Sequence, residues 1–410
     1  MSMAGSTDTA LMAALAALPH NPRVVASGNF ATPMVVLDLL DKVVPTYRLH
    51  MLNAQRGIPD REGVQHETVF VGPGMRFSGS LSYIPTRLSL LPRLFGTRLP
   101  PDVALIHTSL PHRGTVSLGT EVNVLPAAIE QVRRRGGLVL AQMNAAMPYT
   151  YGDAVLPLDM VDHAIEVDVP LASPAQPVLD DASRVIGERV AARVPDGAVI
   201  QTGIGAVPAA TLGELSHRRG LSVWTEMFSD GVLSLHRSGA LDPAKPVTTS
   251  FVFGSPELYA WIDNNDRIRL TRTETTNDPA IIRNNAQMVS VNTALQVDLF
   301  GQANASRIGR AIYSGFGGQT DFVVGALHAP DGQALVALRS WHPKADRSTI
   351  VPLVDEPVTS FQMTAVVTEQ GVAEVSGHDQ RTQATQLIEH AAHPSVREEL
   401  VEEARALHLL

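Results

Sequence analysis

The sequence of 410 residues contains no cysteine. Disulfides, thiolate metal ligands and a cysteine nucleophile are therefore excluded, and nothing in the composition indicates an oxidising compartment. No apolar run reaches the ~18 residues that a membrane-spanning helix needs. The Ala-rich run 10–18 has no basic residue before it, so we expect a surface helix and not a signal peptide. We therefore expect a cytoplasmic protein without a membrane partner, whose catalysis would use oxygen or nitrogen groups.

Several motifs that define enzyme classes are also missing. The sequence has no Walker loop, no HExxH and no G-x-S-x-G, and its 14 histidines are scattered. A serine hydrolase is therefore disfavoured, and no metal site is predicted. His107 and His112 flank a predicted strand end, and we interpret both as structural. The net charge of −9 argues against a nucleic-acid partner, so any phosphate site must be built locally.

Apolar runs bounded by glycine or proline alternate with helical patterns along the chain. This alternation predicts an α/β fold in which mainly parallel sheet is covered by helices. A helix is expected over 126–135, because proline stands near its start, three arginines lie in its last turn and two glycines follow. The expected strands are 103–106, 138–142, 164–167, 199–201, 288–291, 335–338 and 365–367.

A faint internal duplication indicates two similar α/β domains. The peptides Val24–Gly28 and Val199–Gly203 each end in a glycine turn, and a proline that opens an apolar helix follows five residues later, at Pro33 and Pro208. Because a proline-rich stretch lies near 170–177, we predict an N-terminal domain over 1–175 and a C-terminal domain over 176–410. The segment 71–101 has no steady period, and we interpret it as an irregular excursion.

One carboxylate, Glu226, directly follows a short apolar strand, at the end where open α/β sheets collect ligands. Later turns could supply hydrogen-bond donors from Asn277 and the pair Gly317-Gly318, and a second carboxylate from Glu369. Glycines let backbone N–H groups approach an oxyanion without obstruction. Together these residues indicate a glutamate nucleophile acting on an acyl group. The structural alternatives are an ion-paired strand end, an Asx turn and a simple chain reversal.

The turn Gly203-Ile-Gly205 imitates the dinucleotide fingerprint G-x-G-x-x-G, with Glu226 near the position of a ribose-binding acid. A nicotinamide enzyme is therefore the rival interpretation. Pro208 stands where the third glycine belongs, which disfavours that interpretation. A turn at a helix N-terminus still offers N–H groups to an anion or oxyanion, although a tight turn alone would also use glycines.

Five ordered blocks resemble the acetyl-CoA hydrolase/transferase family, whose members include 4-hydroxybutyrate, propionate and succinate:acetate CoA-transferases. The resemblance is dense from about residue 199 to 404 and thinner before that, and segment 71–101 gives no clear match. The blocks are QTGIGAVPAATLGEL, WTEMFSDGVLSL, NDPAIIRNNAQMVSVNTALQVDLFGQANA, SGFGGQTDFVVGA and VTEQGVAEVSG.

The resemblance implies two domains of the coenzyme A transferase fold and Glu226 as the nucleophile. It assigns oxyanion and acyl-positioning roles to Asn277, Gly317, Gly318 and Glu369. Coenzyme A is then a substrate together with a small carboxylic acid, no cofactor is permanently bound, and a homodimer is expected.

Lys344 lies where similar proteins carry a lysine in a glycine-containing loop, and the resemblance implies that it meets the coenzyme A phosphates. In this sequence that loop lacks glycines, and the run after Glu369 differs around His378.

Three functions follow from these interpretations. The first is an acyl-CoA:carboxylate CoA-transferase that works by ping-pong kinetics through glutamyl intermediates. The second is an acyl-CoA hydrolase, if water intercepts the same intermediate. The remaining possibility is a dinucleotide enzyme or a catalytically silent binding protein.

Overall fold

A computed structural model describes residues 4–410 and divides them into two compact units. Unit 1 contains the described residues up to Pro174 together with Thr248–Thr276. Unit 2 contains Ala175–Val247 and Asn277–Leu410. The linear domain division at residue 175 remains a prediction; the compact units differ from it in one segment, Thr248–Thr276.

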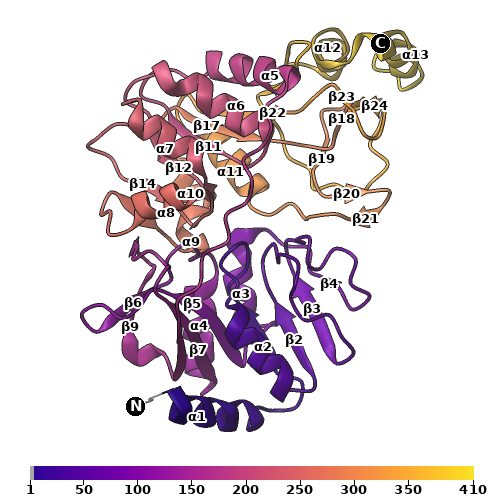
Figure 1. Cartoon of the computed structure of the whole chain (residues 1–410). Helices are drawn as coiled ribbons and strands as arrows, with labels where there is room; N and C mark the ends of the chain where they lie inside the picture. Colours follow the sequence, from indigo (N-terminus) through magenta and orange to yellow (C-terminus); the bar gives the residue numbers. More distant parts are fainter. Residues whose placement is uncertain (1–3) are drawn as a thin grey trace. The chain divides into compact units, whose positions relative to one another are not determined.

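Unit 1 is built on a seven-stranded parallel sheet of order β10-β7-β5-β1-β2-β3-β4 (Figure 1). Strands β1 and β5 are buried along their whole length, which explains why apolar and polar residues do not alternate along them. The strands are β1 (Arg23–Ala26), β2 (Tyr47–His50), β3 (Val64–Thr68), β4 (Ser82–Tyr83), β5 (Val103–Thr108), β7 (Leu138–Asn144) and β10 (His163–Val167).

The helix predicted over 126–135 is confirmed as α4 (Leu125–Arg134). It has proline in its first turn and Arg133 and Arg134 in its last, and Gly136 follows at φ +69°. Helix α4 packs on β1, β5 and β7, while α2 packs on β7. The other helices of the first 174 residues are α1 (Ala4–Ala16), α2 (Met34–Val43), η1 (Leu88–Leu90), α3 (Leu91–Phe95) and η2 (Leu158–Met160).

Segment 71–101 is largely irregular, as expected, but part of it packs into the core of unit 1. It contains β4, η1 and α3, and Leu91 and Phe95 in α3 are fully buried. The remaining elements of unit 1 are β6 (Thr115–Ser117), β8 (Tyr151–Gly152), β9 (Val155–Pro157), β15 (Phe251–Val252), α8 (Pro256–Ile262), β16 (Ile268–Leu270) and α9 (Thr273–Thr276).

Six strands of unit 2 follow one another in the order β27-β26-β22-β17-β11-β12, and only the edge strand β27 is antiparallel to its neighbour. These strands are β11 (Val199–Thr202), β12 (Ser222–Trp224), β17 (Met288–Asn292), β22 (Gln333–Ala337), β26 (Ala365–Val367) and β27 (Val372–Glu374). Strand β14 (Val247–Thr249) spans the point where the chain passes from unit 2 to unit 1.

Two glycines allow helices of unit 2 to pack closely. A Cβ atom at Gly187 of α5 would overlap α6 at Ala210, and one at Gly325 of α11 would overlap Ile282 of α10. Helix α5 packs on β22 and β26, and α11 packs on β17 and β22. The helices are α5 (Asp181–Ala192), α6 (Ala206–Glu214), η3 (Leu215–His217), α7 (Asp230–Arg237), α10 (Pro279–Ile282), α11 (Gln319–His328), α12 (Gln380–Gln386), the π-helical turn Leu387–Ala391, η5 (Pro394–Val396) and α13 (Arg397–Ala406).

Short strands complete unit 2. They are β13 (Met227–Phe228), β18 (Gln296–Asp298), β19 (Ala303–Asn304), β20 (Arg307–Ile308), β21 (Ala311–Ile312), β23 (Trp341–His342), β24 (Arg347–Ser348) and β25 (Ile350–Val351). Most of them belong to the excursions that follow β17 and β22, so the region beside the main sheet is rich in loops.

The two strands of the predicted duplication take equivalent places in their sheets. Strands β1 and β11 each have the next strand of the chain on one side, β2 or β12, and a later strand on the other, β5 or β17. Each is followed by a glycine turn and then a helix, α2 or α6. The predicted fold class is confirmed, because each unit is a mainly parallel sheet covered by helices.

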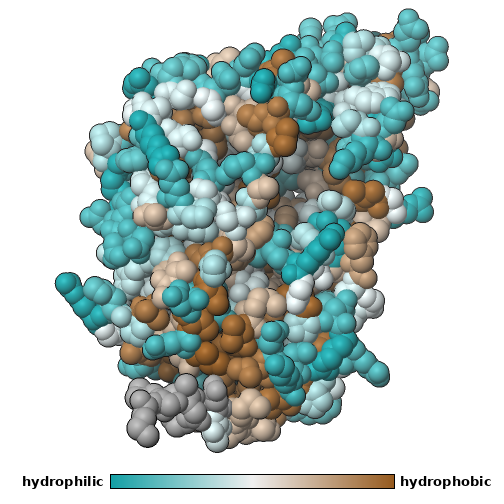
Figure 2. Space-filling model, viewed as in Figure 1, coloured by the Kyte–Doolittle hydropathy of each residue, from teal (hydrophilic) through white to brown (hydrophobic). Residues whose placement is uncertain are grey.

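Within residues 4–410, none of the helices combines the length and the apolar character that crossing a membrane requires. The visible surface is mixed (Figure 2): helices α12 and α13 are mainly hydrophilic, whereas hydrophobic residues gather over part of unit 1.

Candidate active site

Glu226 lies just beyond the carboxyl end of β12, at the edge of the unit 2 sheet where ligands are expected. The Nδ2 of Asn277 donates a hydrogen bond of 2.7 Å to its Oε2. Asn277 is fully buried and precedes α10, whose first turn is capped by Asp278. The structure thus brings together two predicted site residues that are 51 positions apart.

The glycine turn before α11 lies against the same carboxylate. A Cβ atom at Gly318 would overlap both the Oε2 of Glu226 and the Nδ2 of Asn277, so only glycine fits there without displacing one of them. Gly317 has φ +48°, a left-handed conformation that favours glycine. Because Gly318 is the N-cap of α11, the positive end of that helix lies beside Glu226.

The surroundings of Glu226 favour its neutral form. Desolvation raises the pKa of Glu226 to about 7; the hydrogen bond from Asn277 lowers it, and the charge of Asp321 raises it further. Asp321 is fully buried in the first turn of α11, and we did not predict it from the sequence. The sequence feature that could have identified Asp321 as a site residue is its position three residues after Gly318. A carboxyl group whose pKa is near 7 is partly ionised at physiological pH, and the ionised form can act as a nucleophile.

Glu369 lies elsewhere in unit 2. It follows β26, and the strand order puts β26 four positions from β12, or roughly 19 Å at ~4.8 Å per strand. Its carboxylate accepts hydrogen bonds from the backbone N–H and the hydroxyl of Ser340, with a third from Gln370. The oxyanion and acyl-positioning role that the family resemblance implies for Glu369 is not tested by these contacts and stays a prediction.

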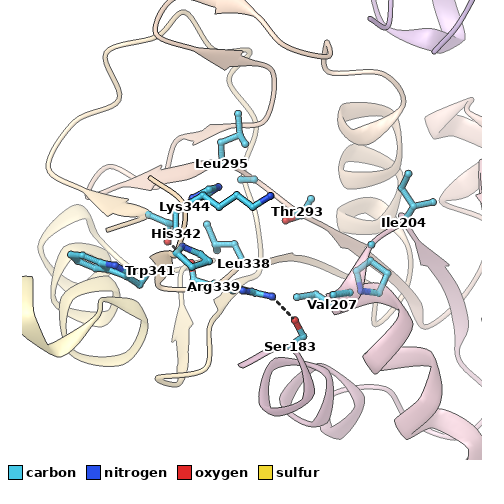
Figure 3. Close-up of a pocket in the computed structure, with 16 residues that line it drawn as sticks. Ser183, Ile204, Val207, Thr293, Leu295, Leu338, Arg339, Trp341, His342 and Lys344 are labelled. Carbon is cyan, nitrogen blue, oxygen red and sulfur yellow. Dashed lines mark hydrogen bonds between the residues drawn. The ribbon is translucent and has the colours of Figure 1, made fainter. Parts of the chain in front are cut away.

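Gly205 and Lys344 line one cavity of about 400 Å³ in unit 2 (Figure 3). Gly205 has φ +113° and is the N-cap of α6, so the conformation itself requires glycine. Arg339 and Trp341 line the same cavity and were missed by the sequence analysis. No spacing rule connects them to Gly205, which is more than 130 residues earlier in the chain.

Gly203 differs from Gly205 in its backbone, because its φ does not lie in the left-handed region; a Cβ atom at either position would meet nothing within 4 Å. The nearby side chain of Gln201, at the end of β11, accepts hydrogen bonds from Ser290 (2.6 Å) and Asn292 (3.2 Å) on β17. This polar group at the carboxyl ends of two adjacent strands was also not predicted.

The fold is an α/β fold of the coenzyme A transferase type, which a solved CoA-transferase structure shares. The family model for the acetyl-CoA hydrolase/transferase N-terminal domain matches residues 54–172, and the model for the C-terminal domain matches residues 254–404. The chain belongs to the acetyl-CoA hydrolase/transferase family, a family of enzymes. The N-terminal match includes 71–101, the segment in which the sequence blocks gave no clear match.

Similar proteins agree with this assignment. The chain is 36% identical over 414 residues to 4-hydroxybutyrate coenzyme A transferase of Clostridium kluyveri, covering 95% of both proteins. The 4-hydroxybutyrate CoA-transferase from Porphyromonas gingivalis is 31% identical in sequence to this chain. Its crystal structure gives a TM-score of 0.82, with 98% of this chain and 97% of that one covered. RipA from Yersinia pestis is 26% identical with a TM-score of 0.90 over the whole of both chains.

Proposed function

We propose that the protein is an acyl-CoA:carboxylate CoA-transferase in which Glu226 is the nucleophile. The observation that carries this proposal is the carboxylate of Glu226, which Asn277 holds by a hydrogen bond and against which only glycine fits at position 318. Short-chain acyl-CoA and a small carboxylic acid are the substrates. Coenzyme A takes part as a substrate and not as a resident cofactor.

The reaction exchanges one thioester for another. An oxygen of Glu226 attacks the thioester carbonyl carbon, the C–S bond breaks, and an acyl-glutamyl anhydride and the CoA thiolate form. The thiolate then attacks the glutamyl carbonyl carbon and expels the donor carboxylate, leaving a glutamyl-CoA thioester. The acceptor carboxylate repeats these steps in reverse and regenerates Glu226. Because the thioester consumed and the thioester formed have similar energies, no ATP is needed. Ping-pong kinetics result, because the covalent glutamyl-CoA intermediate separates the two half-reactions.

Each tetrahedral intermediate carries a negative charge on oxygen that fixed donors can stabilise. We propose that Asn277 and the backbone of Gly317 and Gly318 supply these donors, because a Cβ atom at Gly318 would overlap the carboxylate of Glu226. The cavity lined by Gly205 and Lys344 is the proposed coenzyme A site, with the lysine ammonium meeting phosphate. Gly203 directly precedes Ile204, which lines the cavity.

Glu369 is proposed as a positioning residue in this scheme. Its carboxylate fixes Ser340, the neighbour of Arg339 in the wall of the cavity. Loss of Glu369 should therefore slow exchange without removing the nucleophile.

Hydrolysis of acyl-CoA is the second candidate, since the family description includes hydrolases. Water that reached the anhydride would release the acyl group as a free acid and restore Glu226. The same residues would serve both reactions, and exclusion of water would decide between them. A cytoplasmic homodimer is the setting that we propose for either activity.

Covalent trapping tests the nucleophile. The protein is incubated with short acyl-CoAs and treated with hydroxylamine or borohydride, and the modified peptide is mapped. We expect modification at Glu226 that depends on acyl-CoA, and loss of both modification and exchange in Glu226→Gln. The matched control is Glu214→Gln, which changes an exposed glutamate at the end of α6.

The pH profile gives an independent readout of the same residue. Because only the ionised form attacks, kcat/KM should rise with pH through an apparent pKa of about 7. Full turnover in Glu226→Gln, or labelling at another residue, contradicts the proposal. Free acid formed without an added acceptor would identify the hydrolase.

A further inference from the structure

Two cationic side chains of unit 2 reach into the same cavity. Arg339 and Lys344 both come from the stretch that follows β22, and Figure 3 shows them extending towards Ile204 and Val207 at the start of α6. The lining also includes apolar residues, among them Leu295 and Leu338. A ligand that fits this lining has an anionic end and a less polar remainder, which is the chemistry of a coenzyme A thioester.

The two cations differ in how they are held. Arg339 Nη2 lies 2.6 Å from Asp180 Oδ2 and donates a hydrogen bond of 3.3 Å to the hydroxyl of Ser183. The other carboxylate oxygen of Asp180 accepts from the backbone N–H of Ser183 at 3.0 Å, which caps helix α5. Asp180 is therefore fixed by the helix that it caps, and it holds Arg339 against the wall of the cavity.

This ion pair is weak enough to be exchanged for another anion. The side chains of Arg339 and Asp180 are 30% and 44% exposed, and pairs with such exposure contribute little because water screens them. A phosphate group offers Arg339 two charges and several acceptor oxygens in place of one carboxylate. Arg339 can therefore pass from Asp180 to a phosphate without leaving a buried charge unpaired.

We propose that Asp180 is a specificity-determining residue that masks Arg339 in the free enzyme and sets the affinity for the phosphate-bearing end of coenzyme A. Binding of the phosphate displaces Asp180 from the guanidinium, so part of the binding energy is spent on breaking the Asp180–Arg339 pair. This inference rests on the proposed function, because it takes coenzyme A as the ligand of the cavity. It adds a residue outside the motif blocks that suggested that function.

The variant Asp180→Asn tests the effect of the negative charge of Asp180 separately from its role as a helix cap. Asparagine caps helices about as well as aspartate does, so α5 keeps its cap while Arg339 loses its counter-charge. By isothermal titration calorimetry, the Kd for coenzyme A should fall by about 2–5-fold in this variant. Arg339→Gln should raise the Kd several-fold, and adding Asp180→Asn to it should have no further effect. A gain of affinity cannot result from misfolding, so the test survives any instability of the arginine variant.

Two controls define the result. Pantetheine, which lacks the phosphates, should bind the wild type and every variant equally. Asp181→Asn removes the same charge one residue further along the chain and should leave the Kd for coenzyme A unchanged. If the wild type does not bind coenzyme A, the proposed function fails. If it binds but Asp180→Asn leaves the Kd unchanged, or changes that of pantetheine equally, the inference about Asp180 alone is overturned.

Discussion

Glu226 and Glu121 are acids whose pKa is raised to about 7, in both cases mainly by desolvation. Their neighbours differ. Glu226 has Asn277 on one oxygen and the glycine turn beside it, whereas Glu121 is 3% exposed in unit 1 and its Oε1 accepts from the backbone N–H of Gly28 at 3.1 Å. The same physical cause thus gives a candidate nucleophile in one unit and a structural acid in the other.

The raised pKa of Glu121 predicts that the stability of the protein depends on pH. Burial raises the pKa of Glu121 to about 7 in the folded state, against 4.5 for a glutamate in the unfolded chain. Its stabilising effect is therefore complete below pH 4.5 and is lost as pH rises through 7. Glu121→Gln remains neutral at every pH. We expect the free energy of unfolding of this variant to exceed that of the wild type at pH 8 by up to about 3 kcal/mol, and by about 1 kcal/mol at pH 5.

Urea unfolding at the two pH values measures this difference. Glu62→Gln, at an exposed glutamate of unit 1, is the control and should give the same small effect at both. If the advantage of Glu121→Gln were larger at pH 5 than at pH 8, the folded protein would hold Glu121 ionised, contrary to this account.

Helix α11 and the glycine turn before it form the element that meets Glu226. Gly318 has φ −92°, which any residue can adopt, so glycine is required there by the space next to Glu226 and Asn277 and not by the backbone. A methyl group at this position would force the carboxylate or the amide to move. At a reacting centre, a displacement of ~1 Å costs about 100-fold in rate.

We therefore expect Gly318→Ala to lower kcat by roughly 100-fold while the protein stays folded. The matched control is Gly213→Ala in α6, where a Cβ atom would meet nothing within 4 Å. That control should keep its kcat and gain about 0.5–1 kcal/mol of stability, because alanine is the better helix former. Circular dichroism and steady-state kinetics on both variants check the prediction, which a fully active Gly318→Ala enzyme would contradict.

At the scale of the whole molecule, the candidate nucleophile, the glycine turn and the cavity with Lys344 all belong to unit 2. Coenzyme A that binds this cavity should therefore stabilise unit 2 against local opening. At a concentration about 100 times its Kd, the ligand adds about 2.7 kcal/mol to every opening that releases it.

Hydrogen exchange followed by mass spectrometry measures this effect. Peptides from α6 and from 338–349 should exchange up to about 100-fold more slowly with coenzyme A at that concentration. Peptides from β5 and β7 of unit 1 are the internal control and should change much less. Equal protection of both units would show that the ligand acts on the molecule in another way.

The sequence predicted the local parts of the fold and of the site. The helix over 126–135 and the parallel α/β class followed from glycine and proline punctuation and from apolar runs. The positions of Glu226, Asn277 and Gly318 at the ends of elements also followed from local pattern. The short elements within segment 71–101 did not, because β4, η1 and α3 are too brief to show a period.

The sequence by itself determined which residues end strands and begin helices, because those choices depend on neighbours within a few positions. Only the tertiary structure decided which of those ends meet. The order of strands put Asn277 and Gly318 against Glu226 but held Glu369 at Ser340, and it brought Ser183 to Arg339 across 156 residues. Burial, which raises the pKa of Glu121 and of Glu226, likewise depends on what the rest of the chain packs around each carboxylate.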